Sequence, residues 1–255
     1  MILKLNNQEF IDTDKPIDIS IPMHDGPDAV LAWYGEPIKL EPVMTERFIG
    51  DVSKGGAVNF RNLFMNPHVN GTHTECLGHI SKEFVSINKC LKTFHFEGVL
   101  VSVNPQDENN SDGKTDRIIT KEILKQSVSQ LALSKDLNVL IVRTLPNTED
   151  KLSFNYSNTN PTFFTKAAIE YVNELGIEHL MVDLPSIDRE EDGGLLIGHH
   201  TFWNYPENPQ FHKTITELIY VPESADDGTY LVNIQITALE NDASPSKVTL
   251  YEIQS

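Results

Sequence analysis

Eight short apolar runs, each bounded by turn-forming residues, constrain the fold of this chain more than any other feature. They are rich in valine and isoleucine, and this composition favours β-strands over turns of buried helix. Strands are therefore expected to dominate the beginning and the end of the chain. The runs cover residues 17–22, 57–64, 98–103, 138–142, 178–183, 217–221, 230–239 and 248–253.

Two amphipathic segments in the middle of the chain are predicted to form helices. The first covers residues 120–135, where Thr120 is a suitable N-cap for an apolar stripe with helical spacing. The second covers residues 160–176, with Asn160 as its N-cap and Gly176 at its C-terminal end. Both stripes are typical of packing against a core.

Two polar, turn-rich stretches are expected to be exposed loops: residues 104–117, and the acidic stretch 188–194. The first is not interpreted as a domain boundary, no internal repeat is visible, and no low-complexity run interrupts the chain. Residues 1–255 are therefore expected to form a single mixed α/β domain with a largely antiparallel sheet or barrel.

The formal charge of −17 argues against nucleic acid as a partner, because affinity for phosphates comes from lysine and arginine. The two cysteines, Cys76 and Cys90, are too few for a disulfide framework or a cysteine-based zinc site. No segment reaches the roughly 20 apolar residues of a membrane helix, and the first residues lack the apolar core of a signal peptide. We expect a cytoplasmic protein with neither a membrane nor a nucleic-acid partner.

The densest group of metal-ligating side chains lies in residues 66–80, which contain His68, His73, Glu75 and His79. In an extended segment His73, Glu75 and His79 share one face, and neighbours two apart lie roughly 6.5–7 Å from each other. His73 and Glu75 can therefore converge on one ion, whereas His79 stands farther along and can face a bound water. His68 has the opposite parity and reaches the same ion only if the chain turns near Gly71.

A second, weaker group lies in residues 198–222 and contains His199, His200, His212 and Glu217. Adjacent histidines point to opposite faces of a strand, so His199 and His200 are expected to have different roles. Glu217 lies in an apolar run, where an unpaired carboxylate is costly to bury. A metal ion or a hydrogen-bond donor would offset that cost.

Imidazole and carboxylate ligands suit zinc, manganese or iron better than calcium. A metal with an open coordination position lowers the pKa of water towards ~7 and polarises a carbonyl group. This chemistry predicts hydrolysis of an amide, lactam or ester. The sequence contains no nucleophile elbow, Walker loop, dinucleotide fingerprint or H-E-x-x-H helix that would favour another enzyme class.

The segment GTHTECLGH, from Gly71, resembles the motif H-x-G-T-H-x-D-x-P-x-H of the cyclase family, which includes kynurenine formamidase and isatin hydrolase. IDISIP near the start, VDLPSID from Val182 and ITELIYVP around Glu217 resemble other segments of that family, so the resemblance extends through most of the chain. Three positions differ. Glu75 replaces an aspartate, Leu77 replaces a proline, and the first histidine is displaced by one position to His68.

The resemblance implies a role for each matching residue. His73 and Glu75 become metal ligands, with His68 as the displaced third candidate, and His79 becomes the general acid and base. His199 and Glu217 become candidate ligands of a second metal bridged by Glu75, although His200 is the alternative to His199. Trp33 would line an aromatic substrate pocket, unless it is a core or surface residue.

The resemblance also implies a fold and an activity. The fold is a swivelling β/β/α domain, a barrel-like mixed β-sheet flanked by helices, assembled as a homodimer or homotetramer. The activity is hydrolysis of a carbon–nitrogen bond in an amide-like small molecule, using one or two divalent transition metal ions, zinc first and manganese second. N-formylkynurenine, an intermediate of tryptophan catabolism, is the first candidate substrate, which would make the protein an arylformamidase. The alternatives are a hydrolase of cyclic amides such as isatin, and an inactive member that binds a metal or a small molecule.

Overall fold

Seven strands close into a barrel in the computed structural model, which describes residues 1–110, 113–131 and 137–254. Their order is β16-β9-β12-β14-β15-β8-β17, and β17 pairs back onto β16 to complete the ring. The short strand β3 (Ile17–Asp18) extends the sheet beside β17. The barrel strands are β8 (His73–Cys76), β9 (His95–Val103), β12 (Val139–Thr144), β14 (His179–Val182), β15 (Thr214–Glu217), β16 (Gly228–Ile236) and β17 (Ala243–Glu252).

The sheet is mixed, because β9, β12, β14 and β15 run parallel while the other barrel pairings are antiparallel. Parallel neighbours require crossover connections, and helices α2 (Lys121–Val128), α3 (Lys166–Glu174) and α4 (Ile197–Trp203) lie in those connections. The prediction of a largely antiparallel sheet was therefore wrong for this half of the barrel. The barrel-like mixed sheet flanked by helices that the resemblance implied is confirmed.

The central strand β12 shows how the core is divided, because all six of its residues are buried. Val139 and Ile141 belong to a cluster drawn from six of the barrel strands, so this cluster fills the barrel interior. Leu140 and Val142 belong to a second cluster that includes α2 and α3, and this cluster lies outside the barrel. A strand covered on both faces reads as a continuous apolar run rather than an alternating one.

The two predicted helices are present, with different limits. The Thr120 side chain accepts a hydrogen bond from the backbone N–H of Ile123, so the predicted N-cap of α2 is confirmed. The predicted continuation of this helix falls partly on residues 132–136, outside the described residues. The N-cap of α3 is Thr165, not Asn160, because residues 163–164 form strand β13 (Phe163–Phe164) before the helix begins. Gly176 follows the helix with a φ of 78°, as its position predicted.

Residues 111–112 of the loop predicted over 104–117 lie outside the described residues, and the described part of this stretch does not form a loop throughout. It contributes β10 (Gln106–Asn109) and the start of β11 (Thr115–Ile119), which pair antiparallel. β13 adds to β11 in parallel. The polar composition of this segment reflects a hairpin whose outer strand is fully exposed.

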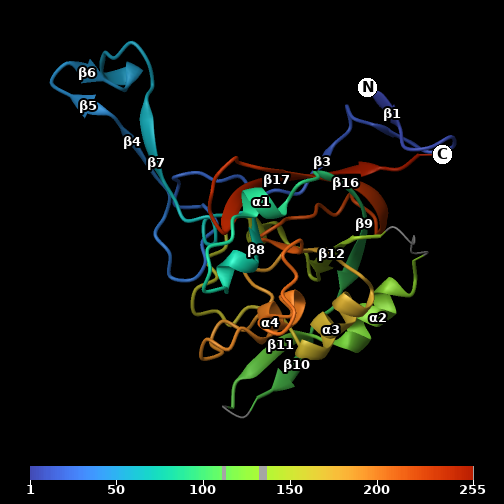
Figure 1. Ribbon diagram of the computed structural model, residues 1–255. Helices are drawn as coiled ribbons and strands as arrows, with labels where there is room; N and C mark the ends of the chain where they lie inside the picture. The colour runs from blue at the N-terminus through green and yellow to red at the C-terminus, as the bar shows by residue number, and fades with distance from the viewer. Residues whose placement is uncertain (111–112, 132–136, 255) are drawn as a thin grey trace.

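Two further ribbons lie outside the barrel. Near the chain start, β1 (Ile2–Lys4) pairs with β2 (Phe10–Asp12). Residues 39–64, which we call the arm, project from the barrel as the blue-to-cyan ribbon in Figure 1. The arm consists of β4 (Lys39–Pro42), β5 (Met44–Thr45), β6 (Phe48–Ile49), the 3-10 turn η1 (Val52–Lys54) and β7 (Arg61–Phe64).

The remaining helical elements are short: α1 (Ile87–Cys90), η2 (Leu77–His79) and η3 (Glu149–Leu152). Among the described residues, no helix has both the length and the apolar character needed to cross a membrane.

Candidate metal centre

The pairing of β8 with β15 brings three predicted site residues together. The register places His73 directly opposite Glu217 and Glu75 opposite Ile215. Ile215 packs in the cluster outside the barrel, whereas Cys76 packs inside it. Because side chains alternate along a strand, His73, Glu75 and Glu217 all face outward from the barrel.

We call His73, Glu75 and Glu217 the inner triad. One ligand atom from each lies within 4.8 Å of the others, and all three residues are buried. His73 Nε2 lies 3.5 Å from Glu217 Oε2, and its Nδ1 lies 3.0 Å from the Gly71 carbonyl oxygen. The sheet register therefore holds this triad, although its members are 144 residues apart in the sequence at the extremes.

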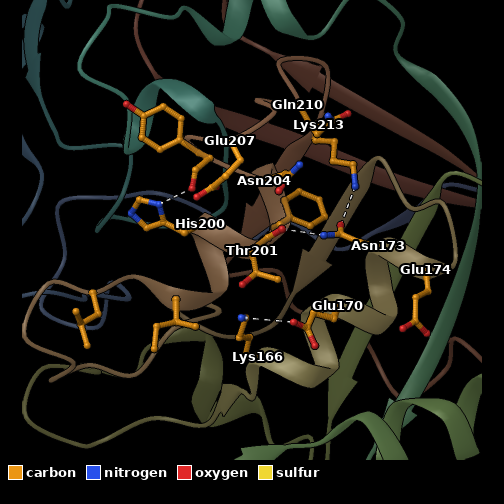
Figure 2. A pocket seen from close by; sticks show the side chains of 14 residues that line it. Lys166, Glu170, Asn173, Glu174, His200, Thr201, Asn204, Glu207, Gln210 and Lys213 are labelled. Atoms are coloured by element: carbon orange, nitrogen blue, oxygen red, sulfur yellow. Dashed lines mark hydrogen bonds and ion pairs between the residues drawn. The ribbon is translucent and has the colours of Figure 1, made fainter.

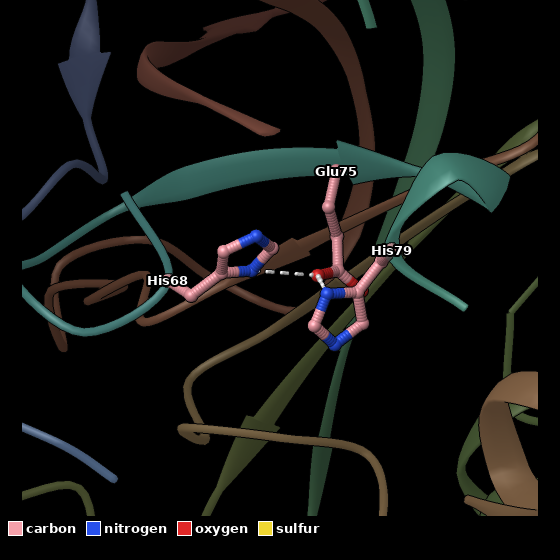
Figure 3. Close-up of side chains that lie close together, drawn as sticks. All are labelled: His68, Glu75 and His79. Carbon is pink, nitrogen blue, oxygen red and sulfur yellow. Dashed lines mark ion pairs between the residues drawn. The ribbon is translucent and has the colours of Figure 1, made fainter. Parts of the chain in front are cut away.

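We call His68, Glu75 and His79 the outer triad; Figure 3 shows both imidazoles directed at the Glu75 carboxylate. The alternation predicted that His79 shares the strand face of His73 and Glu75. It does not, because β8 ends at Cys76. The 3-10 turn η2 folds the chain back and places His79 Nδ1 3.8 Å from Glu75 Oε2. The same turn buries Leu77 in the core between the sheet and the helices, so Leu77 does not share the site face.

His68 reaches the site because the chain turns between it and β8. Asn70 stabilises this turn by accepting a hydrogen bond from the backbone N–H of Asn66. Gly71 has a φ of 144°, and a Cβ there would lie 2.8 Å from Met23 Cγ. The turn that was predicted near Gly71 is thus present, and His68 Nδ1 lies 3.1 Å from Glu75 Oε2.

His199 enters the site from α4, so the two histidines lie on a helix and not on the strand from which their different roles were argued. Its Nε2 lies 3.1 Å from Glu75 Oε1 and 3.9 Å from Glu217 Oε1. His200 points elsewhere: its Nδ1 lies 3.0 Å from the Tyr205 carbonyl oxygen, in a groove lined by α3 and α4 (Figure 2). Of the two adjacent histidines, the structure brings only His199 to the site.

The other candidate of the second group, His212, is exposed and lies 3.7 Å from Glu178, so it takes no part in the site. Cys76, which lies between Glu75 and Leu77, is buried in the barrel interior. Its contact with Cys90 and its burial raise the pKa of the Cys76 thiol, which supports a packing role.

Two site carboxylates escaped the sequence analysis. Asp188 Oδ2 lies 2.6 Å from His199 Nδ1, and Asp242 Oδ2 lies 2.8 Å from His68 Nε2. Each carboxylate thus holds the far side of an imidazole whose other nitrogen faces Glu75. This arrangement is common around metal-binding histidines, where the outer carboxylate orients the ring and raises its basicity. Asp188 could have been found from the acidic loop before the histidine pair, whereas Asp242 has no local signal.

The imidazoles and carboxylates of the site shift one another's pKa values. Burial lowers the pKa of His68, but the close carboxylates of Asp242 and Glu75 outweigh it and raise the pKa to about 10. Burial acts in the same direction on His199, and Asp188 and Glu75 again raise its pKa well above the usual value. Burial raises the pKa of Glu75, yet the surrounding imidazoles lower it well below the ordinary value. The carboxylates therefore favour the protonated forms of His68 and His199.

Two atoms at the centre of the site favour a cation there. Among the described residues, the buried atoms His73 Nε2 and Glu75 Oε2 have no hydrogen-bond partner. His68 Nδ1 is close to Glu75 Oε2 but lacks hydrogen-bond geometry. A buried polar atom left without a partner costs about 1–3 kcal/mol. Nitrogen and carboxylate donors suit a divalent transition metal, so the residues present fit such an ion.

A cavity of about 360 Å³ opens beside the two triads and is lined by Trp33, His68, His79, His199 and Glu217, among others. The Trp33 indole N–H donates to the Pro185 carbonyl oxygen at 3.2 Å, which fixes the ring at the cavity. The φ of Trp33 is 52°, a left-handed conformation that is uncommon for non-glycine residues. Trp33 thus lines the site cavity while its partly buried ring also packs against the small cluster around Val30 and Leu218.

The barrel fold is shared with solved structures described as metal-dependent hydrolases, cyclases and isatin hydrolases. A predicted metal-dependent hydrolase from Bacillus stearothermophilus superposes with a TM-score of 0.62 and 18% identity, covering 93% of this chain and 98% of that one. A novel cyclase gives a TM-score of 0.66 at 15% identity over 95% and 90% of the two chains. An isatin hydrolase bound to the product analogue thioisatinate gives 0.65 at 10% identity over 93% and 92%.

These likenesses establish the shared fold. The Cyclase family model matches residues 17–189, more than half of the chain, and the protein belongs to this family. The family resemblance seen in the sequence is thereby confirmed. No curated protein sequence matches the chain.

Proposed function

We propose that this protein is a metal-dependent hydrolase that cleaves the carbon–nitrogen bond of an amide-like substrate. The observation that carries the proposal is the pair of ligand triads that share the buried Glu75 beside a cavity lined by Trp33. A divalent metal bound there would polarise the substrate carbonyl and lower the pKa of water. Zinc is the first candidate and manganese the second.

The proposed metal ligands are the most deeply buried donor side chains of the site. His73, Glu75 and Glu217 would hold an ion in the inner triad, and His199, with its Nε2 near both carboxylates, would complete or bridge it. His68 would hold a second ion together with Glu75. The donor geometry permits one ion or two.

His79 is the proposed general acid and base. Its side chain is 30% exposed, whereas His73 and Glu75 are fully buried, so His79 can meet both substrate and solvent. In this role it takes a proton from the attacking water and returns it to the departing nitrogen. Its Nδ1 lies 3.6 Å from Asp242 Oδ2, which would stabilise the protonated imidazole.

The proposed substrate is an aromatic formamide such as N-formylkynurenine, with the aromatic ring against Trp33. The alternative is a cyclic amide such as isatin, which the isatin hydrolase among the structural neighbours favours at the level of the fold. A single screen separates the two. Initial rates on N-formylkynurenine, on isatin and on simple esters would be compared for the metal-loaded protein.

The first test is elemental analysis of the purified protein beside a His73→Ala/Glu75→Ala variant. We expect one or two transition ions per chain, lost in the variant. The absence of bound metal in the wild type after incubation with zinc and manganese would refute the proposal. Full metal occupancy with no hydrolysis across the screen would instead identify a metal-binding member without this activity.

A further inference from the structure

A second cavity, of about 350 Å³, lies at the ends of two parallel barrel strands, and we call it the Asp183 cavity. Thr144 is the last residue of β12 and Asp183 directly follows β14, so the parallel pairing brings both residues to the same edge of the sheet. Of the described residues, none lines both this cavity and the one beside the two triads. A ligand in the Asp183 cavity would therefore bind apart from the metal centre.

One of the two carboxylate oxygens of Asp183 lacks a hydrogen-bond partner. Its Oδ2 accepts hydrogen bonds from the Thr144 backbone N–H at 2.8 Å and from Lys151 Nζ at 2.7 Å. Among the described residues nothing donates to its Oδ1, although the side chain is fully buried. Burial raises the pKa of Asp183, so a donor to Oδ1 would stabilise the charged carboxylate.

The cation beside this carboxylate has no donor to spare. Lys151 Nζ carries three N–H groups and lies within 3.3 Å of four acceptor atoms. It already balances the charge of Asp183, and the other two charged lining residues, Arg117 and Asp150, are exposed and opposite in sign. A neutral donor is therefore matched to Oδ1, whereas Lys151 would repel a cation and Asp183 would repel an anion.

Aromatic and other apolar side chains form much of the remaining wall. Phe154 and Tyr156 pack edge to face with their ring centroids 4.9 Å apart. Phe154 is 42% exposed and Tyr156 is buried, so the pair reaches from the surface into the interior. The volume lies within the range of small-molecule sites, roughly 300–1,000 Å³, and exceeds what one water fills. The other apolar lining residues are Pro105, Leu145, Pro146, Pro161 and Leu184.

We propose that the Asp183 cavity binds a neutral phenolic molecule, whose O–H donates to Asp183 Oδ1 and whose ring packs against Phe154 and Tyr156. A single donor on a flat apolar body matches a single unpaired acceptor beside an aromatic wall. An O–H donor to a carboxylate also makes a stronger hydrogen bond than a neutral pair does. A phenol hydroxyl has a pKa of about 10 and stays protonated at neutral pH. This binding does not depend on hydrolysis at the metal centre.

The test is a titration of the full-length protein with phenol, followed by NMR. The reporter is the backbone amide of Thr144, which donates to the same carboxylate. We expect its resonance to shift until the cavity is saturated. Anisole carries a methoxy group in place of the hydroxyl and should bind at least about tenfold more weakly, because it cannot make the hydrogen bond to the charged group.

A variant of the aromatic wall tests the second contact. Phe154→Ala should weaken phenol binding about threefold or more, because one of the two rings is removed. Phe211→Ala truncates another exposed phenylalanine, outside the cavity, and should bind phenol like the wild type. Circular dichroism checks that both variants keep the barrel.

Four results would overturn the proposal. A Thr144 resonance that does not move would mean that water alone fills the cavity. Equal affinities for phenol and anisole would remove the hydrogen bond to Asp183, and unchanged affinity in Phe154→Ala would remove the aromatic contact. Shifts confined to the Trp33 indole N–H would place the ligand in the cavity beside the triads instead.

Discussion

The inner and outer triads share Glu75 but are held in different ways. His73 and Glu217 are fixed opposite each other by the register of two paired strands, and both are buried. His68 and His79 come from a loop and a 3-10 turn, and their side chains are 18% and 30% exposed. The inner triad is thus buried and positioned by the sheet, whereas His68 and His79 of the outer triad are accessible to substrate and solvent.

This difference teaches how one carboxylate can serve two purposes. Metal affinity requires ligands that are already in place, and a sheet provides them because its register cannot slip without exposing a buried face. Proton transfer requires a group that reaches the cavity, and a turn provides it. We therefore expect mutations in the inner triad to remove metal, and mutations at His79 to remove turnover first.

The largest effect is expected for Glu75→Gln, because Glu75 belongs to both triads. An amide cannot supply the negative charge that holds the cation, so metal should be lost and activity should fall by about 10³-fold or more. Elemental analysis and initial rates measure the two effects. Glu83→Gln is a matched control outside the site, and a Glu75→Gln protein that kept both metal and activity would show that neither triad functions.

The comparison is sharpened next by His79→Gln beside His73→Gln. We expect His79→Gln to keep the metal of the inner triad while kcat falls by about 10²–10⁴-fold, the usual contribution of a general acid and base. His73→Gln should lose metal and activity together. Loss of metal in His79→Gln would mean that His79 is a ligand of the outer triad rather than the proton carrier.

A smaller effect is expected from the two orienting carboxylates. Asp188→Asn and Asp242→Asn should each reduce metal affinity or activity by about 10–100-fold, because a histidine ligand loses the group that orients it. Asp188 supports His199 at the buried side and Asp242 supports His68 at the exposed side. Competition with a chelator measures the affinities. If both variants bound metal as tightly as the wild type, Asp188 and Asp242 would not have the proposed orienting role.

The smallest expected effect concerns the pKa of His179, a buried histidine outside the site. Burial, reinforced by His212, lowers the pKa of His179 to about 4, whereas the carboxylates around His68 raise its pKa. Because the pKa of His179 is lower in the folded state than the unfolded value of about 6.5, its stabilising contribution is present above pH 6.5 and is lost as the pH falls towards 4. Between pH 7 and pH 5.5 the loss should be roughly 1 kcal/mol.

Urea unfolding of the wild type and of His179→Gln at these two pH values tests this expectation. The variant keeps a group that can hydrogen-bond to Thr214 but cannot take up a proton. The difference in unfolding free energy between the two proteins should therefore shrink as the pH falls. A difference that stays constant would show that His179 titrates normally.

The sequence by itself determined the local parts of this protein. Each of the eight apolar runs overlaps a strand of the structure, and the Thr120 and Gly176 helix ends were found because capping depends on neighbouring residues. The spacing of His73 and Glu75 placed them on one face of an extended segment, and Gly71 marked the turn that returns His68. These features follow from backbone conformation over a few residues.

The tertiary structure decided everything that depends on pairing across long separations. Glu217 faces His73 only because β15 lies beside β8, and Asp242 meets His68 only because β17 lies on the other side of β8. His79 joined the site because the strand stopped at Cys76, a limit that an alternating pattern cannot predict. Sheet order and register are fixed by burying both faces of the barrel strands at once, and no local segment of the sequence carries that information.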